Sequence, residues 1–272
     1  MDFLFRDASP LSGELWNKID EAVVKTASRL LTGRRFISLY GPLGVDTLSV
    51  PVDNLSKRGE MQEDGALMKT GYRSYQELPL LYSDATLYWR DLENSMNNGL
   101  PVDLSSVVEA AAQCAKKEDE LIFFGNKPLG YEGLFTVEGS AHLERSDWKT
   151  GENPFSDVAK GVETLTEKGI WGKLSLVMSP DLYTQLQRIQ PGTGKMEIDR
   201  VSALVDGNIF RTPVLGANKA ILVSADTQYM DLAVGQDLTA AYLETKDLNH
   251  VLRVLETALL RVKRSDAIVV FD

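Results

Sequence analysis

The sequence predicts an α+β protein. Apolar residues recur at helical spacing in three segments of the first two thirds, and the last third is rich in β-forming residues. Helical and strand-like segments also follow one another irregularly, with no internal repeat and no low-complexity stretch. This mixture is typical of α+β folds rather than of a regular strand–helix alternation.

The first helix is expected to begin after Ser12, which suits a helix N-cap, and to stop at Gly33. Its apolar residues are spaced about four apart, at Leu15, Ile19, Val23, Ala27 and Leu30. A strand-like run follows at residues 36–40 and is closed by the Gly-Pro-Leu-Gly turn of residues 41–44.

Residues 50–78 are polar and spotted with glycine, and they hold no continuous apolar face. They could form a long loop or a two-stranded arm. A structureless loop of this length inside a compact domain is uncommon. The more economical interpretation is an arm that finds its burial on another chain.

Three more helices are expected. The first covers residues 106–120, with Ser106 and Glu109 as a capping box, although Asp103 and Ser105 also suit its start. The second covers residues 156–168, and the third begins at Ser179 with Pro180 as its first residue. Between the last two, residues 174–178 are predicted to form a buried strand.

Further strands are expected in the last third, at residues 209–214, 220–224, 230–234 and 238–243. Residues 251–262 are ambiguous, because their apolar positions also fall on one helical face. We interpret this segment as a strand because its neighbours are rich in β formers.

The length and charge of the chain limit the classes of function that it can have. The chain has 272 residues, and 29 Lys and Arg against 39 Asp and Glu give a formal net charge of −10. At roughly 150 residues per domain, this length suggests about two domains. The acidic balance argues against a general nucleic-acid binder, since phosphate binding needs a surplus of basic residues.

The N-terminal residues and the apolar runs indicate the cellular compartment, and the single cysteine bears on disulfide bonds. The first residues hold an acid where a signal peptide is basic, and nowhere do about 18 apolar residues run together. We therefore expect a cytoplasmic protein with no membrane partner. The lone Cys114 cannot form an internal disulfide.

No metal or catalytic constellation stands out, and we predict that the chain is not an enzyme. His142 and His250 have no His, Cys or paired carboxylate at metal-ligand spacing nearby. A Cys–His nucleophile pair using Cys114 is formally possible, but this residue lies on an apolar helical stripe and is better explained as a small buried hydrophobe.

Two further motifs have an ordinary structural explanation. Residues 191–195, Pro-Gly-Thr-Gly-Lys, lack the first glycine and the Ser or Thr of a phosphate loop, so an exposed flexible loop is the better interpretation. Tyr88 and Trp89 beside Arg90 could stack a planar ligand, although a buried aromatic next to an ion-paired arginine is more frequent.

Several short stretches, in order and over nearly the whole chain, resemble the encapsulin shell proteins, the family once described as linocin-type bacteriocins. They lie at residues 9–11, 33–36, 40–44, 78–82, 88–93, 118–125, 130–134, 230–234 and 249–268. The Trp-Arg-Asp of residues 89–91 resembles the branch whose loci often carry ferritin-like, iron-storing cargo.

The resemblance implies the Hong-Kong-97-type phage capsid fold. The chain would then divide into a discontinuous peripheral domain, an extended arm and an axial domain near the symmetry axes. The peripheral domain would comprise residues 1–45, 90–135 and 226–272, the arm residues 46–89, and the axial domain residues 136–225. The protein would assemble with itself, in about 60 or more copies, into a hollow icosahedral shell.

In encapsulins a cargo enzyme carries a C-terminal targeting peptide that binds an apolar groove on the inner wall of the shell. The resemblance places this groove between the first helix and the peripheral sheet. Arg34 would stand at its edge and donate charge-assisted hydrogen bonds. The other lining residues would be Ile19, Val23, Leu30, Leu232 and Val234, for which ordinary core packing is the alternative.

The resemblance also assigns a pore and bears on a cofactor. The loop Gln190, Pro191, Gly192, Thr193, Gly194 and Lys195 would border the five-fold opening. Some encapsulins bind a flavin through a tryptophan near Trp89. The segment between Pro79 and Val102 is shorter here than in that branch, which argues against flavin and leaves no cofactor expected.

Two other functions stay open from the sequence. One is a phage or prophage major capsid protein that packages DNA. The other is a hydrolytic enzyme using Cys114 or His250, since the family was once credited with such activity.

Overall fold

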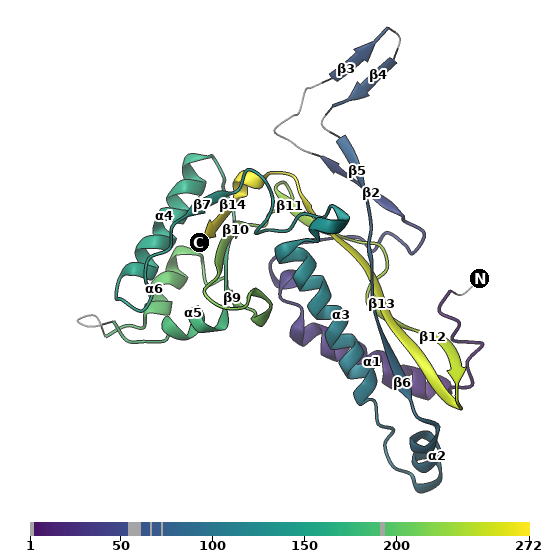
Figure 1. Ribbon diagram of the computed structural model, residues 1–272. Helices are drawn as coiled ribbons and strands as arrows, with labels where there is room; N and C mark the ends of the chain where they lie inside the picture. Colours follow the sequence, from purple (N-terminus) through teal and green to yellow (C-terminus); the bar gives the residue numbers. More distant parts are fainter. Residues whose placement is uncertain (1–2, 54–60, 66, 72, 191–193) are drawn as a thin grey trace.

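The computed structural model describes residues 3–53, 61–65, 67–71, 73–190 and 194–272. Figure 1 shows two bodies side by side and a thin arm that stands clear of them. The long body contains the N-terminal helix and the longest strand, the small body contains most of residues 141–224 and the C-terminal strand, and the arm contains strands β2 to β5.

The long body is built on a five-stranded sheet around β13 (Asn249–Val262). Antiparallel to β13 lie β12 and β6 along its first part and β11 along its last part, while β1 pairs in parallel with β11. The bounds of these strands are Leu39–Tyr40 for β1, Leu80–Leu87 for β6, Met230–Val234 for β11 and Thr239–Lys246 for β12.

The strand predicted at residues 251–262 is confirmed, and the structure explains why a helical face was also compatible with it. Most residues from Leu252 to Arg261 are buried, because α3 packs against one face of β13 and Val50 and Leu78 cover Leu259 on the other. A strand buried on both faces shows a continuous apolar run instead of alternation.

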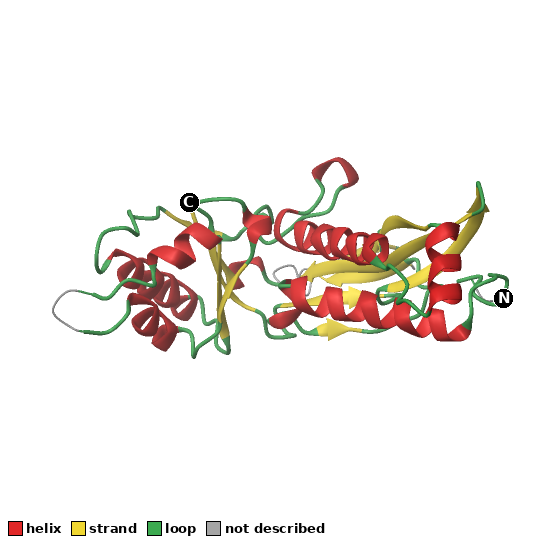
Figure 2. Ribbon diagram, turned by 90° about the horizontal axis from the view of Figure 1, so that it is seen from below, coloured by secondary structure: helices red, strands yellow, loops and turns green. Residues whose placement is uncertain are grey.

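Helices α1 (Gly13–Leu30) and α3 (Ser105–Phe124) lie side by side across the sheet (Figure 2). Ser12 caps α1 as predicted, since its Oγ accepts a hydrogen bond from the amide of Leu15. The helix α3 begins at Ser105, and Asp103 Oδ1 accepts from the Ser105 amide, so the predicted Ser106 and Glu109 capping box is wrong.

The first helix ends at Leu30, three residues before the predicted glycine stop at Gly33. Gly33 begins a short 3-10 turn instead, and its amide donates to Asp119 Oδ1 at 2.9 Å. A Cβ on Gly33 would lie 2.4 Å from Ile122 Cδ1. Close packing on α3, and not a helix cap, is therefore the reason for a glycine here.

The small body contains a second five-stranded sheet, in the order β7-β14-β10-β8-β9, with three helices to one side of it (Figures 1 and 2). The strands are β7 (Ala141–Leu143), β8 (Leu174–Met178), β9 (Ile209–Arg211), β10 (Ala220–Ser224) and β14 (Ile268–Phe271). The helices are α4 (Asn153–Glu167), α5 (Pro180–Gln185) and α6 (Glu197–Leu204).

Most predicted elements of this body are confirmed, with one correction. The strands at residues 174–178 and 220–224 have the predicted bounds, and Pro180 is the first residue of α5. The strand predicted at residues 209–214 ends at Arg211, because Pro213 has no amide to donate to a neighbouring strand and begins a 3-10 turn.

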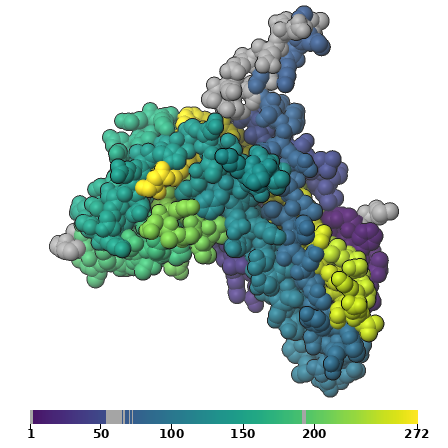
Figure 3. Space-filling view, in the orientation of Figure 1, coloured from purple at the N-terminus to yellow at the C-terminus, as the bar shows by residue number. Residues whose placement is uncertain are grey.

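The arm is two-stranded, as the more economical interpretation predicted. At its base β2 (Ser49–Asp53) pairs with β5 (Arg73–Glu77), and farther out β3 (Met61–Asp64) pairs with β4 (Leu67–Thr70). Figure 3 shows the arm projecting beyond the surface of both bodies. Leu67 and Met68 are 76% and 63% exposed, so apolar side chains of the arm find no cover within the chain.

Sheet pairing places two segments differently from the predicted division of the chain. The range 46–89 given to the arm includes β6, which pairs with β13 along eight residues of the long body. The range 226–272 includes β14, which lies in the sheet of the small body between β7 and β10. β14 is buried along its whole length, whereas β6 buries Ala85 and Leu87, and the pairing shows which sheet each strand joins.

One helix of the long body was not anticipated. Residues around Tyr88 and Trp89 were considered only as an aromatic pair, yet α2 (Trp89–Asn98) begins there. It is short and mostly polar, and Leu92 is its buried residue, so the sequence carries no long apolar pattern that identifies a helix here.

Candidate functional site

A small groove lies where α1 ends, beside the connection between β11 and β12. Its volume is about 230 Å³. We call it the helix-end groove, and it is lined by Val24, Ala27, Ser28, Leu31, Arg34, Asp237 and Leu238. Four of these side chains are apolar and two carry opposite charges, which is the composition of a site for an apolar segment held by a few polar contacts.

Arg34 is the most constrained residue of the groove. Its Nε donates to Glu118 Oε1 at 2.9 Å, its Nη2 donates to Glu256 Oε2 at 2.8 Å, and its Nη1 donates to Asp237 Oδ1 at 2.7 Å. The Arg34 side chain is 14% exposed, whereas Glu118 and Glu256 are almost fully buried. Arg34 thus ties the end of α1 to α3, to β13 and to the β11–β12 connection.

Two of the buried carboxyl groups near Arg34 hold protons more tightly than usual. Burial raises the pKa of Glu256 well above its ordinary value, and the neighbouring Glu118 raises it further, while Arg34 opposes both effects. Burial also raises the pKa of Asp119 to about 6, although the amides of Gly33 and Thr32 donate to its carboxylate and oppose the rise.

The structure does not bring the six predicted groove residues together. Arg34 lines the helix-end groove. Ile19 and Val23 are buried in the core between α1, α3 and the sheet, and Leu232 and Val234 are buried in a different core cluster under β11. These four residues pack inside the molecule, as their alternative explanation held.

Leu30 lies on the opposite flank of α1. There it is 47% exposed and lines a groove of about 540 Å³ between α1 and α3, which we call the interhelical groove. Lys18, Lys25 and Arg29 line it together with Glu21 and Val108. The two grooves are thus separated by the width of α1.

Sequence reasoning missed most of the helix-end groove. Val24 and Leu31 form, together with Ala27 of the predicted stripe, a second apolar stripe on α1, and this spacing was the available signal. Asp237 and Leu238 follow a glycine in a connection more than 200 residues away, and no local pattern links them to the first helix.

The predicted pore loop is described only in part. Pro191, Gly192 and Thr193 lie outside the described residues. At the base of the loop the amide of Gln190 donates to the carbonyl of Lys195 at 2.9 Å, and Ile189 and Met196 form an antiparallel bridge. The side chain of Gln190 is buried and donates to Glu152 Oε1 at 2.8 Å.

The structure places Trp89 at the surface, beside a cavity. Trp89 is 41% exposed and lines a cavity of about 420 Å³ between α2 and the start of α1. The only cation among the lining residues is Lys18, and it is already paired with Glu14 at 2.9 Å. Burial lowers the pKa of His250, which also lines the cavity, so this ring is neutral near pH 7. Beside Trp89 the cavity thus offers one lysine in an exposed ion pair and a neutral imidazole.

Cys114 is a buried core residue, as the sequence indicated. It has no solvent exposure, and its Sγ donates to the carbonyl of Val254 at 3.3 Å. Burial raises the pKa of Cys114 to about 12, and the nearby Glu256 adds to the rise. A thiol in this setting is not a nucleophile at neutral pH.

Ser140, His142 and Asp272 lie in the order of a hydrolase triad. His142 Nδ1 lies 2.5 Å from Asp272 Oδ2, and His142 Nε2 lies 3.3 Å from Ser140 Oγ. The Ser140 hydroxyl, however, donates to the carbonyl of Val137, and the side chains of His142 and Asp272 are 51% and 61% exposed. A nucleophile needs its proton directed to the base, so this arrangement is not catalytic as it stands.

Two structural observations concern metal ions and membranes. Within the described ranges, no three His, Cys, Asp or Glu side chains are grouped so that they could hold a metal ion. None of the helices in the described part of the chain is long and apolar enough to span a bilayer.

Sequence comparison identifies the family. The model of the family described as encapsulating protein for peroxidase matches residues 1–259. The type 1 encapsulin shell protein EncA of Myxococcus xanthus is 38% identical over 273 residues, covering 98% of this chain and 95% of that protein.

Two other relatives are fusion proteins. The diheme-cytochrome-encapsulin shell fusion protein of Kuenenia stuttgartiensis is 37% identical over 266 residues, covering 95% of this chain and 72% of that protein. The ferritin-like-encapsulin shell fusion protein of Pyrococcus furiosus is 25% identical over 210 residues, covering 77% of this chain and 56% of that protein.

Comparison with solved structures identifies the fold. The virus-like particle from Pyrococcus furiosus has a TM-score of 0.76 at 21% identity, covering 95% of this chain and 100% of that chain. The capsid of Myoviridae phage XM1 has a TM-score of 0.61 at 17% identity, covering 89% of this chain and 91% of that chain. The predicted Hong-Kong-97-type capsid fold is thereby confirmed, and the chain belongs to the encapsulin family as a structural subunit of an icosahedral protein shell.

Proposed function

We propose that the shell encloses a cargo protein whose C-terminal targeting peptide binds in the helix-end groove. One observation carries the proposal: of the second apolar stripe on α1, Ala27 and Leu31 are buried, whereas Val24 is left uncovered beside the groove. Val24 on this stripe is 60% exposed, and Arg34 and Asp237 stand beside it with charges that can orient a peptide.

Arg34 is not free to donate hydrogen bonds to a bound peptide, contrary to what the resemblance implies. All three nitrogen atoms of the Arg34 guanidinium already donate to carboxylates. A bound peptide would therefore gain its affinity from apolar side chains against Val24 and Leu238. Its polar atoms would pair mainly with the exposed carboxylate of Asp237.

We further propose that the cargo is a ferritin-like protein that stores iron and protects against oxidative stress. The support is that a relative is described as a ferritin-like-encapsulin shell fusion protein, which joins the two in one polypeptide there. In the present protein the same pairing would arise by non-covalent docking. The loop Gln190–Lys195 would border the pore through which ions enter.

The remaining partners follow from charge and composition. At a net charge of −10 per subunit, the assembled shell repels nucleic acid and attracts cations, so we propose no nucleic-acid cargo. We also propose that no flavin is bound at Trp89, and that the shell resides in the cytoplasm.

A capture experiment tests the docking proposal. The shell is co-expressed with a fluorescent protein that carries the C-terminal segment of a ferritin-like protein encoded beside the shell gene, and fluorescence per purified particle is measured. Val24→Asp places a charge in the helix-end groove, and we expect it to reduce capture about tenfold or more while shells still form. The matched control is Val108→Asp, which lies in the interhelical groove and is 41% exposed.

Three outcomes would contradict the proposal. Unchanged capture by Val24→Asp would show that the helix-end groove is not the site, and loss of capture by Val108→Asp alone would move it to the interhelical groove. Absence of any ferritin-like gene product from shells purified from the native host would reject the iron-storage part.

A further inference from the structure

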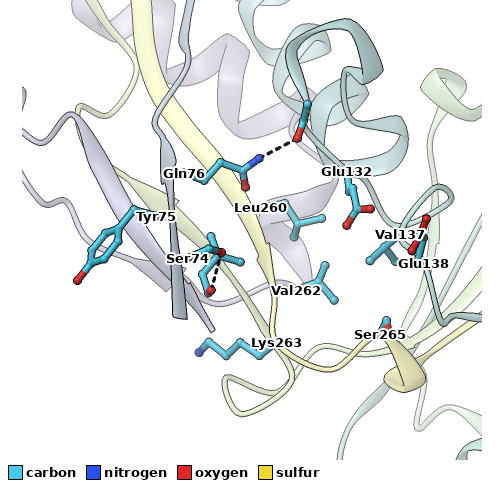
Figure 4. Close-up of a pocket in the computed structure, with 12 residues that line it drawn as sticks. Ser74, Tyr75, Gln76, Glu132, Val137, Glu138, Leu260, Val262, Lys263 and Ser265 are labelled. Carbon is cyan, nitrogen blue, oxygen red and sulfur yellow. Dashed lines mark hydrogen bonds between the residues drawn. The ribbon is translucent and has the colours of Figure 1, made fainter. Parts of the chain in front are cut away.

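A cavity of about 530 Å³ lies beneath the base of the arm, where the arm leaves the long body (Figure 4). From the arm it is lined by Val52, Ser74, Tyr75 and Gln76, and from the body by Gly130, Glu132, Val137, Glu138, Leu260, Val262, Lys263 and Ser265. The arm therefore does not rest flat on the body. It spans an open space, and its direction depends on the contacts at the edge of that space.

Two hydrogen bonds link the arm base to the body at this edge. Arg261 Nη1 donates to the carbonyl oxygen of Pro51 on β2 at 3.1 Å, and Gln76 Nε2 on β5 donates to the carbonyl oxygen of Gly130 at 3.0 Å. The second bond is visible in Figure 4. Each strand of the arm base is thus tied to the body by a side-chain hydrogen bond. Next to them, Val50 and Leu78 are buried against the sheet.

Arg261 is held rigidly by the sheet. It lies opposite Asp231 in the antiparallel pairing of β13 with β11, and its Nε and Nη2 donate to the two Asp231 oxygens at 2.6 and 2.7 Å. Its Cζ lies 4.0 Å from the centre of the Tyr40 ring. Arg261 and Asp231 are 6% and 3% exposed.

This arrangement is more elaborate than a structural ion pair requires. The two-point pairing with Asp231 uses one edge of the planar guanidinium and fixes its orientation, which leaves Nη1 directed at Pro51. A lysine could neutralise Asp231, and Lys263 already contributes a second positive charge at 2.7 Å. The feature that only an arginine supplies is the bond to the arm.

In the assembled shell, a second copy of the chain would lie against the exposed side chains of the arm. The exposed apolar residues Leu67, Met68 and Tyr75 need cover that their own subunit does not provide. In a closed shell, the arm of each copy contacts a neighbour, and each copy is contacted in the same way by another arm. The angle between arm and body within one subunit therefore fixes the angle between two neighbouring subunits.

We propose that Arg261 is a positioning residue for shell assembly, which acts through the Pro51 carbonyl to hold the arm at one angle to the body. Gln76 holds the second strand in the same way. When either bond is lost, the cavity beneath the arm leaves it room to tilt. Neighbouring subunits then meet at more than one angle, and shells of one size are no longer the single product.

The test compares particle diameters, which an ordinary loss of stability does not change in this way. Arg261→Gln removes the fork and its bond to Pro51. The matched control is Arg253→Gln on the same strand. Arg253 forms a forked pair of the same geometry with Asp84 at 2.7 and 2.9 Å and lies 4.0 Å over Tyr82, although this pair is more exposed than that of Arg261. Among the described residues, Arg253 makes no hydrogen bond to the arm base. Purified particles are sized by electron microscopy, and thermal unfolding is recorded for each variant.

We expect wild-type protein and Arg253→Gln to give one diameter. Arg261→Gln should give a distribution with additional diameters or incomplete shells, and Arg261→Lys should do the same because it keeps the charge without the fork. If Arg261→Gln does not fold, the particle diameters of Gln76→Leu test the proposal instead. The Gln76 side chain donates one hydrogen bond to the body, to the Gly130 carbonyl. A single wild-type diameter for Gln76→Leu and for every Arg261 variant that folds would overturn the proposal. Equal broadening by Arg253→Gln would overturn it as well.

Discussion

The carboxyl groups of Glu118 and Glu256 meet at the same nitrogen of Arg34. Nη2 lies 2.5 Å from Glu118 Oε2 and 2.8 Å from Glu256 Oε2, and both carboxyl groups are almost fully buried. Glu256 Oε1 has no hydrogen-bond partner among the described residues. One guanidinium cannot neutralise two carboxylates at a buried site, so the pair keeps a proton on Glu256.

The proton on Glu256 makes stability depend on pH. Because the folded-state pKa of Glu256 is raised above its ordinary value, this group favours folding most at low pH, and its contribution is lost as pH rises toward the folded-state pKa. We expect Glu256→Gln, which imitates the protonated acid, to raise the unfolding temperature at alkaline pH and to flatten its decline with pH. Thermal unfolding between about pH 6 and pH 9 measures this, and a decline as steep as that of the wild type would contradict it.

Removal of Arg34 is expected to destabilise the subunit itself. Arg34→Met leaves the Glu118 carboxylate buried without a partner, and losing one member of a buried ion pair costs about 3–5 kcal/mol. Arg253→Met is the control, because its pair with Asp84 is partly exposed and is worth about 0–1 kcal/mol. Denaturant midpoints of purified shells report the difference, and equal midpoints would refute the role of Arg34 as a structural hub.

Two glycines at the ends of α1 allow a matched test of packing. A Cβ at Gly33 would meet Ile122 Cδ1 at 2.4 Å, whereas a Cβ at Gly13 would meet nothing within 4 Å. We expect Gly33→Ala to destabilise the protein by about 1–3 kcal/mol through overpacking. Gly13→Ala should be neutral or slightly stabilising, by less than about 1 kcal/mol, because alanine favours the helix. The same order of effects is expected in thermal unfolding, and the reverse order would count against the packing explanation.

The buried thiol gives a chemical readout of the folded state. Since burial raises the pKa of Cys114 to about 12, almost no thiolate exists at pH 8. We expect a thiol-specific reagent to label native shells very slowly and unfolded protein at the rate of a free cysteine. Rapid labelling of intact shells would show that Cys114 is accessible.

The sequence alone predicted those helices and strands whose residues show a local apolar periodicity. The stripe from Leu15 to Leu30 identified α1, Pro180 marked the start of α5, and the β formers of the last third identified β10, β11 and β13. The short helix α2 escaped because most of its residues are polar and Leu92 is the one that is buried. The resemblance to the encapsulin shell proteins, carried by short stretches along the chain, indicated the family that the comparisons confirm.

Tertiary structure alone decided the candidate site and the setting of the arm. Periodicity tells which residues are buried but not what they pack against, so Ile19 and Leu232 could be placed in one groove although they lie in separate cores. The carboxylates that surround Arg34 come from positions 118, 237 and 256, and the residue that holds Pro51 is Arg261. Contacts across such separations depend on how strands pair and helices pack, and no local pattern in the sequence encodes them.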